Sequence, residues 1–237
     1  MVTIEFDRLT TFPGARILDI GCGTGRHVCA AYSLPDIFVV GADTQIKDLQ
    51  ESQQKLNFHD ACNAHGGGIW CLAGADIRNL PFRDASFDIV ICSEVLEHIE
   101  PPHTAMDEIV RILKPGGELA VSVPRWFPEK ICWMLWEGYW KVPGGHVRIF
   151  RRQEIETLLD RSGVRRTGVH HAHSLHVPYW WMKCIADHWG IGTAAAKAYH
   201  RFLEWDIFNK PAFTRRLEHL LNPIIVKSLV LYAKKRL

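Results

Sequence analysis

Short apolar runs alternate with helix-forming stretches along the first half of the chain. The apolar runs lie at 17–20, 37–43, 69–73, 87–92 and 118–123, and helix-forming residues such as those of 45–61 lie between them. Strands that are apolar on both faces are typical of a parallel sheet covered by helices on each side. The alternation therefore predicts a doubly wound α/β fold. Later runs at 164–171 and 228–233 predict a sixth and a seventh strand.

Two aromatic-rich segments do not fit this alternation. Residues 125–149 follow strand five and predict a lid insertion, and residues 174–227 predict a helical insertion between strands six and seven. We expect a single domain over 1–237 that carries both insertions. Most of the nine tryptophans lie outside the strands, which favours a wall for a large apolar or planar ligand. Docking on a membrane surface, helped by basic residues of the second insertion, is the alternative.

The composition excludes several classes of protein. The chain has 237 residues, 47% hydrophobic and 23% charged, with a net charge of +2, so it is globular and lacks a strongly basic nucleic-acid footprint. Its seven cysteines form no Cys-x-x-Cys pair, which argues against a disulfide framework and a structural zinc site. The start of the chain lacks the basic and apolar regions of a signal peptide. We expect a cytoplasmic protein.

A glycine-rich loop follows the first strand. Gly21, Gly23 and Gly25 separate that strand from helix-forming residues that begin at His27. Glycines let the backbone turn sharply without a Cβ, and the start of the next helix offers unpaired N–H groups, so the loop predicts a nucleotide-type pocket. A dinucleotide fingerprint needs a further glycine where Arg26 stands, so NAD or FAD fits poorly.

Three longer motifs carry a family resemblance. Asp19-Ile-Gly-Cys-Gly-Thr-Gly25 resembles the first motif of the class I S-adenosylmethionine-dependent methyltransferases. Leu80-Pro-Phe-Arg-Asp-Ala-Ser-Phe-Asp88, together with the following Ser93-Glu-Val-Leu-Glu-His-Ile99, and Leu113-Lys-Pro-Gly-Gly117 look like the ubiquinone/menaquinone-biosynthesis-like (methyltransferase type 11) branch. The resemblance covers residues 16–163 and implies a Rossmann-like, seven-stranded, mostly parallel sheet.

The resemblance also implies a cofactor site for S-adenosylmethionine, with S-adenosylhomocysteine as the product. Asp43 would bind the ribose, although it could equally cap the next helix, and Asp76 with Ile77 would contact the adenine, although they could be a turn and a core residue. The complete set of expected cofactor-binding residues is Asp19, Gly21, Cys22, Gly23, Gly25, Asp43, Thr44, Asp76, Ile77 and Ser93.

The acceptor side is less constrained by the sequence. The Asn/Asp-Pro-Pro-aromatic motif of DNA and amide methyltransferases is absent after strand four, and Cys92 does not follow a proline as a cytosine-attacking nucleophile would. His98, His146 and His171 are the candidates for a catalytic base, and Glu94 could itself be the base. A helix across 94–98 would place Glu94 and His98 on one face. A structural histidine is the alternative for His98.

No metal site is expected from the sequence. Residues 170–173 and His176 form a histidine cluster, but strand alternation separates neighbouring residues onto opposite faces and no carboxylate lies nearby. Clustered Asp or Asn ligands of catechol-type enzymes are not found around strand four.

These patterns predict a methyltransferase for a hydrophobic small molecule. The methyl group would go to oxygen or carbon of a quinone, a polyketide, another aromatic or a glycolipid, and nucleic acid is not an expected partner. Peripheral membrane contact stays open. The alternative is a catalytically inactive protein that keeps the nucleotide pocket for binding or assembly.

Overall fold

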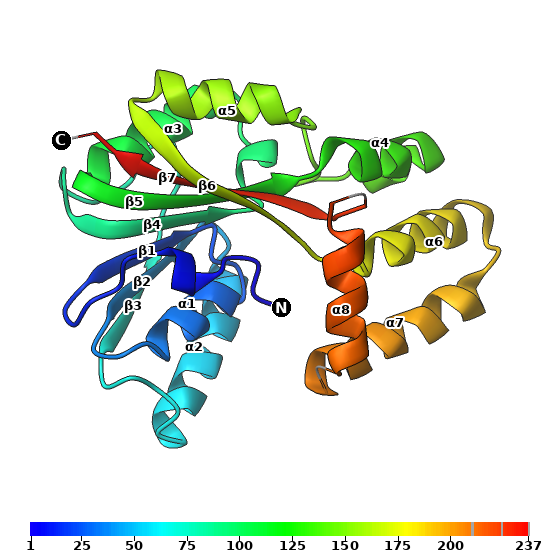
Figure 1. The fold of residues 1–237 in the computed structure, drawn as a ribbon, viewed down its shortest axis with the longest axis horizontal. Coiled ribbons are helices and arrows are strands. Elements are labelled where there is room, and N and C mark those ends of the chain that lie inside the picture. Colours follow the sequence, from blue (N-terminus) through cyan, green and yellow to red (C-terminus); the bar gives the residue numbers. More distant parts are fainter. Residues whose placement is uncertain (210, 224, 237) are drawn as a thin grey trace.

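A seven-stranded sheet forms the centre of the computed structural model, which describes residues 1–209, 211–223 and 225–236, apart from the side chain at 219 (Figure 1). The strand order is β3-β2-β1-β4-β5-β7-β6, and the neighbours from β3 to β5 are parallel. β7 lies antiparallel between β5 and β6. The strands are β1 (Arg16–Ile20), β2 (Phe38–Asp43), β3 (Ile69–Gly74), β4 (Phe87–Ser93), β5 (Leu113–Pro124), β6 (Val164–Ala172) and β7 (Ser228–Lys235).

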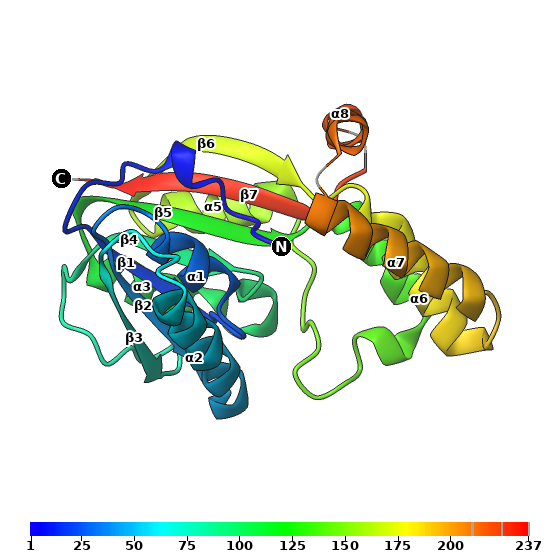
Figure 2. The same ribbon diagram turned by 90° about the horizontal axis from the view of Figure 1, so that it is seen from below.

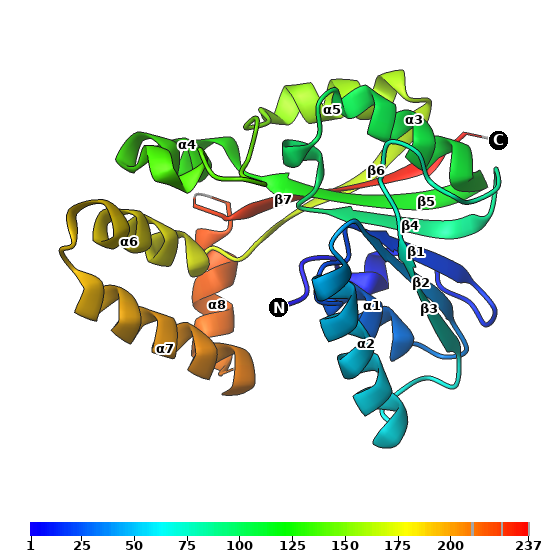
Figure 3. The same cartoon turned by 180° about the vertical axis from the view of Figure 1, so that it is seen from behind.

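Helices cover both faces of this sheet. On one face, apolar residues of α1 and α2 pack against the sheet, together with Ile4 and Leu9 from the start of the chain. On the other face, α3 and α5 pack through residues such as Met106 and Leu159 (Figures 1 and 3). The bounds of these helices are α1 (Arg26–Tyr32), α2 (Ile46–Ala61), α3 (Pro102–Ile112) and α5 (Arg152–Arg161). The predicted doubly wound fold is confirmed.

The remaining helices extend from one end of the sheet (Figure 2). They are α4 (Trp126–Leu135) after β5, and α6 (His176–Trp189), α7 (Thr193–Asn209) and α8 (Ala212–Leu221) between β6 and β7. Trp181 Nε1 donates a hydrogen bond to the carbonyl of Pro128, which ties α6 to α4. Helical insertions at these two places were predicted and are confirmed. None of the described helices is long and apolar enough to cross a bilayer.

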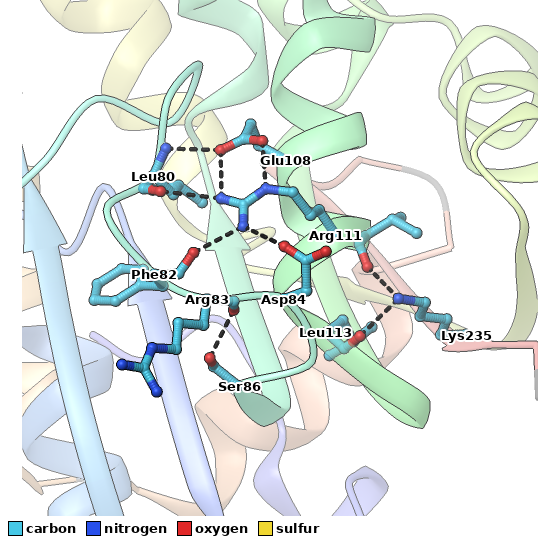
Figure 4. A network of polar contacts seen from close by, with 10 residues as sticks. Leu80, Phe82, Arg83, Asp84, Ser86, Glu108, Arg111, Leu113 and Lys235 are labelled. Carbon is cyan, nitrogen blue, oxygen red and sulfur yellow. Dashed lines mark hydrogen bonds and ion pairs between the residues drawn. The ribbon is translucent and has the colours of Figure 1, made fainter.

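Arg111 of α3 fixes the loop that precedes β4 (Figure 4). Its guanidinium donates to the carbonyls of Leu80 and Phe82 and to the carboxylates of Asp84 and Glu108. Glu108 in turn accepts from the amide of Leu80. Planar guanidinium groups suit such forked contacts. The motif that begins at Leu80 is therefore held in place structurally, in the connection that leads from β3 to the amino end of β4.

His27 makes the stability of the fold depend on pH. Its side chain is 2% exposed, and its Nε2 accepts a hydrogen bond of 3.1 Å from the amide of Thr3. Burial, with the charges of Arg26 and the N-terminus, lowers the pKa of His27 from 6.5 to about 3. Below pH 6.5 the unfolded chain therefore binds a proton that the folded chain does not bind, so stability falls as the pH falls towards 3.

We predict that His27→Gln, which keeps a neutral acceptor, flattens this dependence. The free energy of unfolding of the wild type should fall more steeply between pH 6 and pH 4 than that of the variant, by up to about 1.4 kcal/mol per pH unit. Urea unfolding at stepped pH measures both slopes. Parallel slopes would show that His27 is not buried in its neutral form.

Candidate active site

A cavity of about 440 Å³ lies at the carboxyl ends of the parallel strands. It is next to the place where the strand order reverses between β1 and β4, which is where doubly wound sheets bind ligands. The predicted site residues that line it are Gly21, Asp43, Thr44, Asp76, Ile77, Glu94 and His98. The structure therefore brings the ends of β1, β2, β3 and β4 together around one hollow.

The glycine loop closes one side of this cavity. Gly21 has φ +66°, and a Cβ there would lie 2.4 Å from the side chain of Val95, so only glycine fits. Gly23 has φ +50°, and a Cβ there would meet nothing within 4 Å, so the backbone is open to a ligand at this point. Gly25 directly precedes α1.

Asp43 at the end of β2 holds the loop in shape. Its Oδ2 accepts a hydrogen bond of 2.8 Å from the amide of Gly23, and its Oδ1 accepts one of 2.8 Å from the amide of Gln45. The N-cap residue of α2 is Gln45, so the alternative in which Asp43 caps that helix is wrong. Each carboxylate oxygen keeps a further lone pair, which a ribose hydroxyl can use.

Asp76 and Ile77 follow β3 on the opposite wall. The carboxylate of Asp76 accepts hydrogen bonds from the side chain of Arg78, and these bonds lower its pKa. Ile77 is 4% exposed and belongs to the hydrophobic core, while it also lines the cavity. Ile77 is therefore a core residue, as the alternative interpretation held, and it lines the cavity as well.

Seven predicted residues lie outside the cavity lining: Asp19, Cys22, Gly23, Gly25, Ser93, His146 and His171. Asp19 is 1% exposed, neither of its oxygens has a hydrogen-bond partner among the described residues, and burial raises its pKa to about 7. Cys22 is buried, and this burial raises the pKa of its thiol. Ser93 is also buried, and its Oγ lies 2.8 Å from Ser122 Oγ. Asp19, Cys22 and Ser93 support the loop and the strand ends from behind.

Glu94 and His98 both line the cavity, although the helix expected across 94–98 is wrong. Glu94 has a left-handed φ of +58°, and residues Leu96–His98 form a single 3₁₀ turn, η2. Ser122 Oγ donates a hydrogen bond of 3.0 Å to Glu94 Oε1. This contact, with the Ser93 contact behind it, aims the carboxylate at the cavity.

His98 contacts His146, which returns to the site from the segment after α4. Their ring centroids lie 4.8 Å apart in an edge-to-face arrangement. His98 Nδ1 lies 3.2 Å from the carbonyl oxygen of Gly145, which makes Nδ1 the protonated nitrogen when the ring is neutral. Burial, with the charge of His146, lowers the pKa of His98. The ring is therefore neutral near pH 7, with the lone pair on Nε2.

Sequence reasoning missed the ion pair behind His146. Glu129 of α4 is 2% exposed; its Oε1 lies 2.6 Å from His146 Nδ1, and its Oε2 accepts from Lys227 Nζ at 3.2 Å. Burial alone would raise the pKa of Glu129, but the hydrogen bonds and charges of His146 and Lys227 outweigh it and lower the pKa to about 2. Burial opposes the charge on Lys227, but the Glu129 carboxylate outweighs it and raises the pKa of the ammonium. The partners are too far apart in the sequence for a local signal.

The histidine cluster at 170–176 holds the start of the chain. His170 Nε2 lies 3.2 Å from the carbonyl oxygen of Thr3, and His173 Nε2 lies 3.2 Å from its hydroxyl oxygen. A larger hollow of about 820 Å³ lies beside the starts of α3 and α5, and none of the predicted site residues lines it. The cavity at the strand ends is therefore the candidate site.

Part of the chain matches a known family. Residues 18–121, which are less than half of the chain, match the methyltransferase domain family.

Two curated relatives and one solved structure illustrate the similarity. An O-methyltransferase of Aspergillus nomiae is 34% identical over 116 residues, 49% of this chain and 49% of that protein. A demethylmenaquinone methyltransferase of Clavibacter sepedonicus is 35% identical over 108 residues, 46% of this chain and 40% of its own. The chain thus spans about half the length of these relatives or less.

The solved structure is the phosphoethanolamine N-methyltransferase 2 of Haemonchus contortus in complex with S-adenosyl-L-methionine. It aligns with a TM-score of 0.61 and 16% identity over 98% of this chain and 51% of that chain. At this identity the likeness shows the fold alone. The matched methyltransferase domain contains the glycine loop, Asp43, Asp76, Glu94 and His98, whereas Glu129, His146 and Lys227 lie beyond it.

We predict that the Glu129–Lys227 pair acts as a unit. Glu129→Gln leaves the Lys227 ammonium buried without its counter-charge and should lower the free energy of unfolding by about 3 kcal/mol. Adding Lys227→Met removes the unpaired charge and should restore at least half of that loss. A double-mutant cycle in guanidinium measures the coupling. Additive losses from the two substitutions would contradict the pairing.

Proposed function

We propose that this chain transfers the methyl group of S-adenosylmethionine to an oxygen or carbon atom of a hydrophobic small molecule. One observation carries the proposal: a single cavity is lined by Asp43, Asp76, Glu94 and His98. The match to a methyltransferase domain supports the reaction. The relatives named as an O-methyltransferase and a demethylmenaquinone methyltransferase support a small-molecule acceptor.

The residues of the cavity fit this cofactor. The backbone at Gly23 is open to the methionine end. The buried carboxyl of Asp19, which accepts no hydrogen bond from the described residues, lies next to last in the strand before the same loop. Asp43 has free lone pairs for the ribose hydroxyls, and Asp76 with Ile77 would contact the adenine. Thr44 also lines the cavity. When bound, the cofactor supplies a methyl group that is already electrophilic.

The protein must then position the acceptor, exclude water and remove a proton where the acceptor is a hydroxyl. Glu94 is the base in this proposal, because its carboxylate lines the cavity and is oriented by Ser122. His98 lines the cavity, and the ring of His146 packs against it from behind. Gly144 of the segment 125–149 also lines the cavity, and Tyr139 of the same segment contacts both His146 and Trp180.

The second insertion, residues 174–227, suits a hydrophobic acceptor at a membrane surface. Trp205, Phe208, Phe213 and Leu220 are exposed on neighbouring turns of α7 and α8, and exposed Arg216 lies beside them. Exposed aromatic and basic side chains together favour peripheral contact with lipid. All seven cysteines are free thiols, which suits a reducing, cytoplasmic location.

We predict that Asp43→Asn weakens S-adenosylmethionine binding by about 1–3 kcal/mol, because it replaces charge-assisted hydrogen bonds by neutral ones. Isothermal titration calorimetry measures this loss. Glu51→Gln, which changes an exposed carboxylate of α2, is the matched control and should bind like the wild type. Equal affinity of Asp43→Asn and the wild type would show that the ribose is bound elsewhere.

We predict that Glu94→Gln lowers kcat by about 10²–10⁴-fold on a hydroxyl acceptor, with cofactor affinity unchanged within about threefold. A panel of phenols and demethylated quinones with labelled cofactor provides the assay, and Glu137→Gln is the exposed control. Cofactor binding by the wild type without turnover on any acceptor would favour an inactive binding protein instead. An unchanged kcat in Glu94→Gln would show that Glu94 is not the catalytic base.

A further inference from the structure

Three side chains behind the acceptor end of the cavity have the spacing of metal ligands. One ligand atom from each of Glu97, His98 and His146 lies within 4.8 Å of the other two. Among the described residues, this is the one group of three histidine, cysteine, aspartate or glutamate side chains whose ligand atoms lie this close together. In a tetrahedral site, ligand atoms about 2.1 Å from the ion lie about 3.4 Å from one another. Small side-chain rotations would bring the three ligand atoms to these distances.

The carboxyl group of Glu97 accepts no hydrogen bond from the part of the chain that the structure describes. The Glu97 side chain is also fully buried. Burying an unpaired carboxyl group is costly in either protonation state. Its backbone is nevertheless fixed, because the carbonyl of Glu97 accepts a 2.9 Å hydrogen bond from the amide of Val147. The fold therefore holds an unsatisfied acceptor beside two imidazole rings.

Both rings are oriented in the way that metal-binding histidines usually are. His98 Nδ1 faces the carbonyl oxygen of Gly145, and His146 Nδ1 faces the carboxylate of Glu129. Metal-ligating histidines almost always donate one ring N–H to a backbone carbonyl or a carboxylate, which leaves the other nitrogen for the ion. Glu129 is itself fixed by Lys227.

Charged side chains surround Glu97. It interacts electrostatically with Glu94 and with Glu129, and the ammonium of Lys227 interacts with all three glutamates. A divalent ion at this place would give Glu97 its missing partner.

We propose that Glu97, His98 and His146 bind one divalent transition-metal ion at the acceptor end of the cavity, with Glu129 positioning His146. This proposal rests on the proposed function and deepens it. Two histidines and one carboxylate are a ligand set that zinc, manganese and iron(II) accept. The sequence predicted no metal, because neither the histidines of 170–176 nor Asp or Asn residues around strand four make a ligand set, and His146 lies far from Glu97 along the chain.

The ion explains how Glu94 can serve as the base. A carboxylate is a weak base towards an ordinary phenol or alcohol, but a nearby dication lowers the pKa of a hydroxyl by several units. The acceptor proton then passes to Glu94, and the oxygen lone pair forms the bond to the methyl carbon. The carbon–sulfur bond breaks with its electron pair on sulfur, which leaves neutral S-adenosylhomocysteine.

Metal titration of the full chain tests the proposal directly. After treatment with EDTA and dialysis, the wild type should bind one Zn²⁺ per chain in calorimetry, and Co²⁺ should give visible absorption bands of a nitrogen-ligated site. Glu97→Gln and His98→Gln should each weaken Zn²⁺ binding at least 100-fold, and Glu129→Gln about 10–100-fold. His171→Gln, a half-buried histidine outside the group, should bind like the wild type.

Thermal unfolding of the same variants provides the folding control. Zn²⁺ should raise the Tm of the wild type and of His171→Gln and leave that of Glu97→Gln unchanged. Absence of Zn²⁺ binding to a folded wild type, or binding that persists in Glu97→Gln and His98→Gln, would overturn the proposal. S-adenosylmethionine titrated into the metal-free protein separates the two claims, because intact cofactor binding without metal binding would refute only the metal site.

Discussion

The hydrogen bond between the Asp43 carboxylate and the Gly23 amide is the contact on which the rest of the site depends. It joins the end of β2 to the loop between β1 and α1, so two neighbouring strands define one rim of the cavity. Gly21 presses against Val95 at the other rim, which fixes the loop relative to the turn after β4. The strand order then reverses between β1 and β4, and the hollow opens at that place.

Almost the whole cavity lining lies within residues 18–121, the part of the chain that matches the methyltransferase domain family, and Gly144 is the exception. The side chains behind His98 have another origin. Glu129, His146 and Lys227 come from α4, the segment after it and the residue before β7. The family match does not include these segments, so it carries no information about the side chains that support His98.

The sequence predicted the sheet because parallel strands are local apolar runs, and all seven predicted runs overlap observed strands. The observed β5 is longer than the predicted strand, because it begins at Leu113 and the prediction began at 118. Local motifs also predicted the cavity residues Gly21, Asp43 and Asp76. The local geometry at Glu94 was wrong, since its positive φ and the short turn at Leu96–His98 depend on packing under the loop. Glu129 and Lys227 could not be predicted, because their contact joins residues that only the folded sheet brings together.

A structure of this chain with S-adenosylhomocysteine tests the central claim most directly. The account predicts the ribose hydroxyls on the Asp43 carboxylate, the adenine beside Asp76 and Ile77, the amino-acid end over Gly21 and Gly23, and the sulfur facing Glu94 and His98. A nucleoside bound in another hollow, such as the one beside α5, or a cavity that excludes the molecule, would contradict it.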